Sequence, residues 1–405
     1  MPQINPDILR WARETAGYSP EEAVERIGLR AARGRSAVER LMALEAGDVD
    51  PTRTQLTKIS KEYRRPLVTF YMAARPIRGD RGEDYRTLPD ARPPAEDARV
   101  DALLRDVRAR QSMVRALLED DEVGPLAFVG AFSADSGIKA VVAAMHDILA
   151  VDDDAPRKEN MPRSDFDALR SAAENAGVFV LLIGNLGSHH TAFDTTVFRG
   201  FALADPIAPF IVINDQDARQ AWAFTLLHEF AHILIGASGV SGSTRAISGN
   251  RRLSKLEMFC NDVASEFLLP TPDLDLLHLS KDMDVAQMIT AVSEFSEGRN
   301  ISSSMVVYRL FRSNKIDRER WLSISRTLRE FWLKARTDRR IVSREAAGGP
   351  SYYTVKKHRV GAALIALIRR TLKEGTITPT KAGKVLGVKP ANVDTLIRDN
   401  GRQFV

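Results

Sequence analysis

The sequence predicts an α+β protein that is mainly helical, with one small antiparallel or mixed sheet and helical domains on either side of it. Apolar residues recur at helical spacing through most of the chain, whereas the predicted strands all lie between residues 177 and 213. Stretches rich in Pro and Gly separate these regions. A chain of 405 residues with 44% hydrophobic content can bury a large core, and its length is typical of roughly two to four domains.

The N-terminal region, residues 1–75, predicts a bundle of short helices. Asn5 followed by Pro starts the first helix, and Ser19-Pro-Glu-Glu is a capping-box start for the second. Further helices are expected from Ser36 to Ala46 and from Thr52 to Tyr63.

Residues 76–125 predict a linker followed by a helical connector. Pro and Gly are frequent in residues 75–83 and 88–94, and residues 95–120 have the apolar spacing of a long amphipathic helix. After a helix at 165–176, strands are expected at 177–183, 198–204 and 209–213.

One apolar helix contains the sequence His228-Glu-Phe-Ala-His232. Residues four apart are rotated by about 40° around a helix, so both imidazoles leave the same face, at the spacing that can hold one Zn²⁺. Glu229 lies about 100° round the helix, where its carboxylate can take a proton from a water molecule. The motif alone is only moderately specific, and two hydrogen-bonded core histidines are the alternative interpretation.

A second helix, which ends at Pro270, offers two glutamates as a third metal ligand. Glu257 and Asn261 are one turn apart and share a face, whereas Glu266 points the opposite way. We favour Glu257, because Asn261 can orient the bound ligands from behind. Two His, one Glu and an open position are typical of a catalytic zinc site. The neighbouring pair His189-His190, in a predicted loop, is a further candidate contact.

Three segments resemble the ImmA/IrrE family of metallopeptidases: residues 198–214, residues 224–232 and the helix 257–270. The resemblance covers residues 160–310. It implies a zincin-like domain and an intracellular zinc endopeptidase that cleaves a transcriptional repressor, releasing stress-response or mobile-element genes. Mapped by motif, the metal ligands are His228, His232 and Glu257, and Glu229 is the catalytic base. Such ligands bind Zn²⁺ and also accept Mn²⁺.

The helix at 301–312 closes the predicted catalytic domain. Tyr308 and Arg309 on this helix are candidates for stabilising the oxyanion that forms when a peptide carbonyl is attacked. Packing and surface pairing are the alternative roles.

The N-terminal helices resemble the helix-turn-helix domains of the XRE repressor family, on the residues Leu44-Glu-Ala-Gly and Pro51-Thr. The resemblance implies that the third helix enters the DNA major groove. The connection at 28–36 is longer than the usual tight turn, and its surroundings supply four arginines that could reach phosphates: Arg30, Arg33, Arg35 and Arg40. Glu39 and Glu45 would oppose such a contact, and docking to a protein is the alternative.

The C-terminal part of the chain is strongly basic. Residues 315–405 contain 21 Lys and Arg against 8 Asp and Glu, a net charge of +13, although the whole chain carries only +5. Two short helices are predicted on either side of Gly387-Val388, which is the arrangement expected of a second helix-turn-helix. Contact with nucleic acid and docking to a protein both fit this segment.

These features predict four regions: an XRE-like helix-turn-helix domain (1–75), a linker and helical connector (76–125), a zincin-like metallopeptidase domain (126–314) and a basic helical domain (315–405). The single cysteine, the absence of a basic-then-apolar start and the lack of any window near ~20 continuous apolar residues favour a cytoplasmic protein that does not enter membranes. Oligomers are compatible with the sequence.

The predicted function is zinc-dependent cleavage of a repressor or similar regulator, with the helix-turn-helix domains binding DNA or a partner. The alternative is a DNA-binding regulator or antitoxin-like protein that uses the zincin fold only as a scaffold or sensor. The two hypotheses differ in whether Glu229 is needed.

Overall fold

The computed structural model describes residues 3–32, 34–76, 83–85, 94–151, 165–187, 191–241, 251–280, 282–345 and 351–398. The chain divides into two compact units, Met1–Arg81 with Leu88–Arg108, and Gly82–Thr87 with Ala109–Val405. The sequence predicts four regions, with boundaries near residues 75, 125 and 314, and this division into two units does not test those boundaries. The mainly helical α+β class is confirmed. Within the described ranges, none of the helices combines the length and apolar character needed to span a lipid bilayer.

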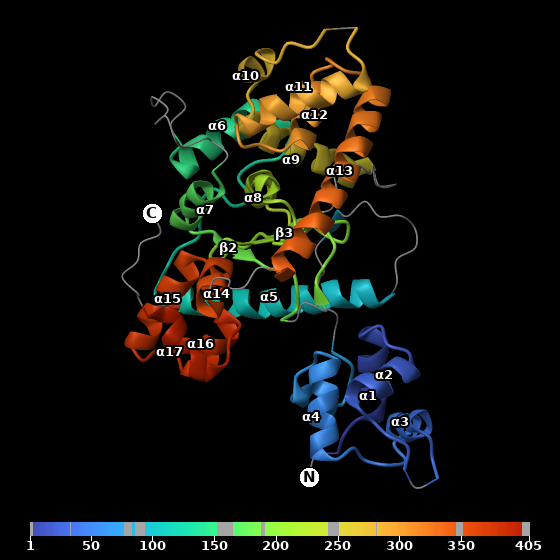
Figure 1. The fold of residues 1–405 in the computed structure, drawn as a ribbon. Helices are drawn as coiled ribbons and strands as arrows, with labels where there is room; N and C mark the ends of the chain where they lie inside the picture. The colour runs from blue at the N-terminus through green and yellow to red at the C-terminus, as the bar shows by residue number, and fades with distance from the viewer. Residues whose placement is uncertain are drawn as a thin grey trace. The chain divides into compact units, whose positions relative to one another are not determined.

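The described residues of the first unit form the short helices that the sequence predicts (Figure 1). They are α1 (Pro6–Thr15), α2 (Pro20–Ile27), α3 (Ala37–Ala46), α4 (Arg53–Glu62) and the 3-10 helix η1 (Leu67–Tyr71). Capping boxes at Ser19, Ser36 and Thr52 begin α2, α3 and α4. The apolar faces of these helices enclose one small core of their own.

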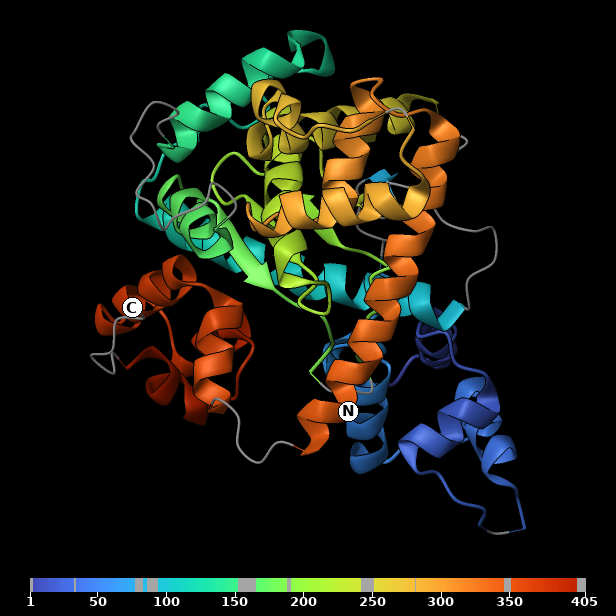
Figure 2. The ribbon, with the colours of Figure 1, turned by 45° about the horizontal axis from the view of Figure 1, so that its top comes forward.

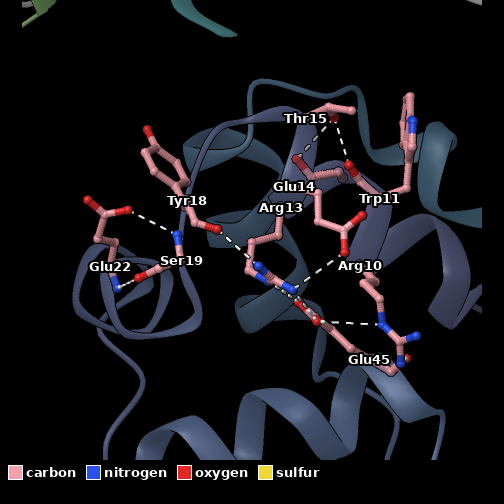
Figure 3. Close-up of polar contacts among 10 residues, drawn as sticks. Arg10, Trp11, Arg13, Glu14, Thr15, Tyr18, Ser19, Glu22 and Glu45 are labelled. Atoms are coloured by element: carbon pink, nitrogen blue, oxygen red, sulfur yellow. Dashed lines mark hydrogen bonds and ion pairs between the residues drawn. The ribbon is translucent and has the colours of Figure 1, made fainter. Parts of the chain in front are cut away.

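A buried ion pair joins α1 to α3 inside this core (Figure 3). The Arg13 guanidinium donates two hydrogen bonds to the Glu45 carboxylate, over 2.7 and 3.0 Å, and a third to the backbone oxygen of Tyr18. Glu45 is only 4% exposed. The expectation that Glu45 would repel DNA is therefore wrong, because its charge is neutralised inside the unit.

The described residues of the second unit contain a five-stranded mixed sheet with the order β1-β5-β3-β4-β2. Its strands are β1 (Glu83–Tyr85), β2 (Phe179–Leu182), β3 (Gly200–Leu203), β4 (Phe210–Ile213) and β5 (Gly239–Ser241). β3 runs antiparallel to β4 and β5, whereas the outer strands β1 and β2 run parallel to β5 and β4. The three predicted strands are confirmed. β5 was not predicted, and β1 forms inside the predicted linker.

Helices cover this sheet, and the central one is α8. The helices of this unit up to residue 345 are α5 (Pro94–Asp120, whose first part belongs to the other unit), α6 (Ile138–Leu149), α7 (Phe166–Asn175), α8 (Arg219–Ile235), α9 (Arg251–Leu268), α10 (Thr271–Asp275), α11 (Val285–Glu297), α12 (Ser303–Arg312) and α13 (Arg318–Glu345), with the 3-10 helix η2 (Ala134–Ser136). α8 packs on β3 and β4 and also contacts α9 (Figures 1 and 2). Because it is covered on both sides, almost the whole of α8 from Thr225 onward is buried.

The remaining described residues form a compact helical group, the C-terminal bundle, shown in red in Figure 2. It consists of α14 (Tyr352–Val360), α15 (Ala362–Lys373), α16 (Pro379–Leu386), the 3-10 helix η4 (Pro390–Asn392) and α17 (Val393–Ile397). The predicted helices on either side of Gly387 are confirmed. The bundle packs against the sheet and the helices that cover it, with α14 on β2 and α15 on α7.

A second buried ion pair, between Arg170 and Glu174 of α7, holds the bundle in place. The Glu174 carboxylate accepts hydrogen bonds from the backbone N–H groups of Ala362 and Ala363 over 3.0 and 3.1 Å, which caps α15. Arg170 donates to the Val180 oxygen of β2 over 2.6 Å. Burial raises the pKa of Glu174 and lowers that of Arg170 despite their mutual attraction. The Arg170–Glu174 pair is therefore shielded from water, and it links α7 to both β2 and the start of α15.

Candidate metal centre

Two neighbouring helices bring together the three predicted metal ligands, here called the metal cluster: His228 and His232 from α8, and Glu257 from α9. The two histidine Nε2 atoms are 3.1 Å apart. The Glu257 carboxylate oxygens lie 3.4 Å from His228 Nε2 and 2.9 Å from His232 Nε2. The sequence argument that placed Glu257, and not Glu266, beside the histidines agrees with this arrangement.

These separations fit one zinc-sized ion. Ligand atoms that surround Zn²⁺ tetrahedrally at about 2.0–2.1 Å lie about 3.3 Å from one another. The observed distances of 2.9 to 3.4 Å bracket that value. Three protein ligands of this geometry leave a fourth position for water or substrate, which distinguishes a catalytic from a structural site.

The electrostatics of the cluster favour a cation. Burial alone would raise the pKa of Glu257, but the charge of His228 and hydrogen bonds from both histidines lower it to about 2. Burial lowers the pKa of His228, but the charge and hydrogen bond of Glu257, together with smaller effects of Glu229 and Asn261, raise it overall. Glu257 is thus an anion at neutral pH, held in a buried site where a bound cation is favoured.

Glu229 is completely buried and lies against strand β3. A Cβ atom added to Gly200 would lie 2.9 Å from Glu229 Oε1 and 2.7 Å from Thr225 Cγ2. Any side chain at this strand position would displace Glu229. Gly200 is therefore part of the site, and the sequence interpretation missed it. The available signal was a glycine inside a strand pattern, which often marks a close approach of two segments.

A comparison with protein families bears on this site. Residues 173–311 match the family model Peptidase_M78, described as the IrrE N-terminal-like domain. The chain contains an IrrE N-terminal-like domain. The match confirms the resemblance to the ImmA/IrrE metallopeptidases, and the metal cluster lies inside it. No curated protein matches the chain.

Two further residues of the IrrE-like domain lie close to the ligands on α9. Asn261 is 5% exposed, and its hydrogen bond to His228 contributes to the raised pKa of that histidine. This is the position from which we expected it to orient a bound ligand, and that role stays a prediction. Cys260 is fully buried, and burial raises the pKa of its thiol well above the ordinary value, so thiolate chemistry is not favoured.

The two candidates for oxyanion stabilisation have other partners. The Tyr308 hydroxyl donates to Asp262 Oδ1 over 2.7 Å. Arg309 pairs with Glu266 and donates to Thr271 Oγ1 over 3.1 Å. These contacts attach α12 to α9 and α10. They do not support a role for either residue at the oxyanion, which stays an untested prediction.

The predicted nucleic-acid contacts lie outside the IrrE-like domain. Arg30 and Arg35 are exposed, and the Arg40 guanidinium donates to the backbone oxygen of Arg30. Arg33 and the pair His189-His190 lie outside the described residues. In the C-terminal bundle, Arg359 pairs with Asp215 over 2.6 Å and Arg370 pairs with Asp121. Part of the basic charge of the bundle is thus used in attaching it to the rest of the second unit.

Proposed function

We propose that the protein is a zinc-dependent endopeptidase that cleaves a transcriptional repressor or a similar regulator, in a response linked to stress or to mobile elements. The observation that carries this proposal is the convergence of His228, His232 and Glu257 at ligand spacing beside the buried Glu229. The match to a peptidase family supports the reaction class. A cytoplasmic location fits a substrate of this kind.

The residues of the site divide the work of peptide hydrolysis. His228, His232 and Glu257 would hold the ion, which when bound polarises a carbonyl and makes a water molecule more acidic. Glu229 takes the proton of the attacking water and then gives it to the leaving amine. Its place against Gly200 fixes the carboxylate, and the apolar packing of α8 keeps bulk water away from it.

The terminal regions are proposed as docking modules. The N-terminal unit supplies four capped helices in the order of an XRE-type domain, with exposed arginines in the connection between α2 and α3. It would bind DNA or a protein partner. The C-terminal bundle, with its short helices around Gly387, would also bind DNA or a protein partner.

The experiment that tests the proposal compares new protein N-termini by mass spectrometry in source cells that carry the wild type or Glu229→Gln, with and without DNA damage. We expect a fragment that requires the wild-type glutamate. Glu266→Gln is the matched control, because Glu266 lies on α9 but pairs with Arg309 away from the metal cluster. It should retain the fragment. If Glu229→Gln retains both the fragments and the cellular phenotype, the non-proteolytic regulator is the correct interpretation.

A further inference from the structure

The two edges of the sheet differ in what lies along them. At the β2 edge, the Val180 oxygen accepts a hydrogen bond from Arg170, and α14 packs against the strand. The other edge would be β5, but residues 83–85 of the same chain pair with it as β1. The outer side of β2 and the side of β5 that faces away from β3 are therefore both occupied by residues that lie outside the IrrE-like domain.

β1 lies close to the catalytic residues through the register of the sheet. Tyr85 pairs with Ser241 of β5, and Ser241 pairs with Gly200 of β3. Gly200 is the residue that Glu229 packs against. Two strand spacings of about 4.8 Å separate Tyr85 from Gly200, so the end of β1 is about 10 Å from the strand that touches the catalytic base. β1 also contacts α9, the helix that carries Glu257.

An exposed strand edge is a docking place for an extended peptide, because its unpaired backbone groups supply hydrogen bonds to any sequence. Without β1, the β5 edge would offer such a place beside α9. The β2 edge does not, because α14 and Arg170 occupy it. A substrate that is extended for cleavage would therefore compete with β1 for the same backbone groups.

β1 has the properties of a removable occupant. It is only three residues long, and Glu83 and Asp84 are residue types that are depleted in strands. Its conformation therefore depends on β5, not on its own sequence. Strands as short as β1 belong to the parts of a protein that open with the lowest free energy.

We propose that residues 83–85 hold the peptidase in a closed state by occupying the β5 edge where an extended substrate would pair, and that displacement of β1 opens the site. This inference rests on the proposed endopeptidase function. It predicts that, once the metal is bound, the position of β1 sets the activity of the intact chain.

The first arm of the test asks whether β1 covers β5, and it does not need activity. In full-length Glu229→Gln protein, Glu83 and Asp84 are both replaced by Pro. Backbone N–H groups alternate between the two sides of a strand, so this pair removes whichever of the two donors faces β5. The control carries Glu83→Gln and Asp84→Asn, which keep both donors. Hydrogen exchange of residues 239–241 should be faster in the proline variant than in the control, and equal exchange would overturn the inference whatever the activity.

The second arm locks β1 in place. Asp84 and Val240 are register partners, so Asp84→Cys with Val240→Cys puts two cysteines at a strand spacing that a disulfide can bridge. Unfolded casein serves as the probe substrate. If the edge is free about a tenth of the time, the proline variant should cleave about tenfold faster than the wild type. The oxidised lock should cleave far more slowly than its reduced form, while the wild type, whose only cysteine is buried, should not respond to oxidation.

The outcomes separate the inference from the function on which it rests. Equal cleavage by the oxidised and reduced locks overturns the closed state while leaving the endopeptidase intact. Absence of cleavage in every form, including the proline variant with its metal bound, overturns the proposed endopeptidase function and the closed state together. If the proline variant shows faster exchange in residues 239–241 but the oxidised and reduced locks cleave casein at the same rate, β1 has a structural role only.

Discussion

Helix α9 carries two groups of acidic residues that look alike in the sequence and differ in their surroundings. Glu257 faces His228 and His232, which are charged only when protonated. Asp262 and Glu266 lie five and nine residues further along the helix. Asp262 pairs with Arg312 and Glu266 pairs with Arg309, and both arginines are permanent cations. The same helix thus bears one acidic group beside titratable partners and one beside fixed charges.

The difference teaches how a metal centre can be distinguished from a structural ion cluster. Asp262 accepts hydrogen bonds from Tyr308 and Arg312, and these contacts attach α12 to α9. In the metal cluster, Glu257 is an anion whose partners are imidazoles, which can release their protons and bind a metal ion instead. Asp262 and Glu266 are already paired with the fixed positive charges of Arg312 and Arg309. The comparison therefore predicts that substitutions in the metal cluster weaken zinc binding, whereas substitutions of Asp262 or Glu266 lower the stability of the fold and leave zinc binding unchanged.

The largest effect is expected for His232→Ala. Removing one of three ligands should lower zinc affinity by more than about 100-fold, because even residues behind the ligands contribute 10–100-fold. Zinc content after dialysis and competition with a chelator measure this loss, and cleavage should disappear with the metal. Glu266→Gln should keep its zinc. An unchanged zinc content in His232→Ala would refute the assignment of the ligands.

Glu174→Ala extends the comparison to the buried ion pair under the C-terminal bundle. It leaves Arg170 buried without its counter-charge and removes the acceptor that caps α15, which should cost about 3–5 kcal/mol. Urea denaturation measures the loss, and hydrogen exchange should show it in α14 and α15 first. Arg170→Met with Glu174→Leu, which removes both charges, should cost less. Equal losses in the single and double variants would contradict this explanation.

Asp262→Ala tests the structural group on α9. The buried Tyr308 hydroxyl would lose its acceptor, which costs about 1–3 kcal/mol, whereas the partly exposed Arg312 reaches water and adds little. The free energy of unfolding should fall while zinc bound per folded molecule stays constant. Asp262→Asn keeps an acceptor and should lose less. A loss of zinc that exceeds the loss of folded protein would mean that the two groups on α9 are coupled.

The metal cluster could be predicted from the sequence because its geometry is local. Four residues along one helix fix the relation of His228 to His232, and the turn shared by Glu257 and Asn261 selects the third ligand. Most of the helices and the three strands β2, β3 and β4 were predicted for the same reason, since each has its own caps or apolar pattern. These features depend on neighbours within a few residues.

What could not be predicted depends on pairing over long distances in the chain. Two of the three residues of β1, Glu83 and Asp84, disfavour strands, and the segment becomes a strand because β5, far along the chain, offers an edge. The same holds for Gly200, whose importance comes from Glu229, and for Glu174, whose partners Ala362 and Ala363 lie in the C-terminal bundle. The two partners of such a contact are far apart in the sequence, so no local sequence pattern contains both of them.

The smallest effect is expected for Glu266→Gln, and it completes the comparison on α9. The amide oxygen can still accept from Arg309 and Thr271, so only the charge is lost, and the cost should be about 1 kcal/mol or less. Because Glu266 points away from the metal cluster, zinc affinity and the cleavage rate per folded molecule should equal those of the wild type. Glu257→Gln, the same chemical change nine residues earlier on the same helix, should instead weaken zinc binding strongly. If the two substitutions had equal effects on zinc, the division of α9 into a catalytic and a structural group would be wrong.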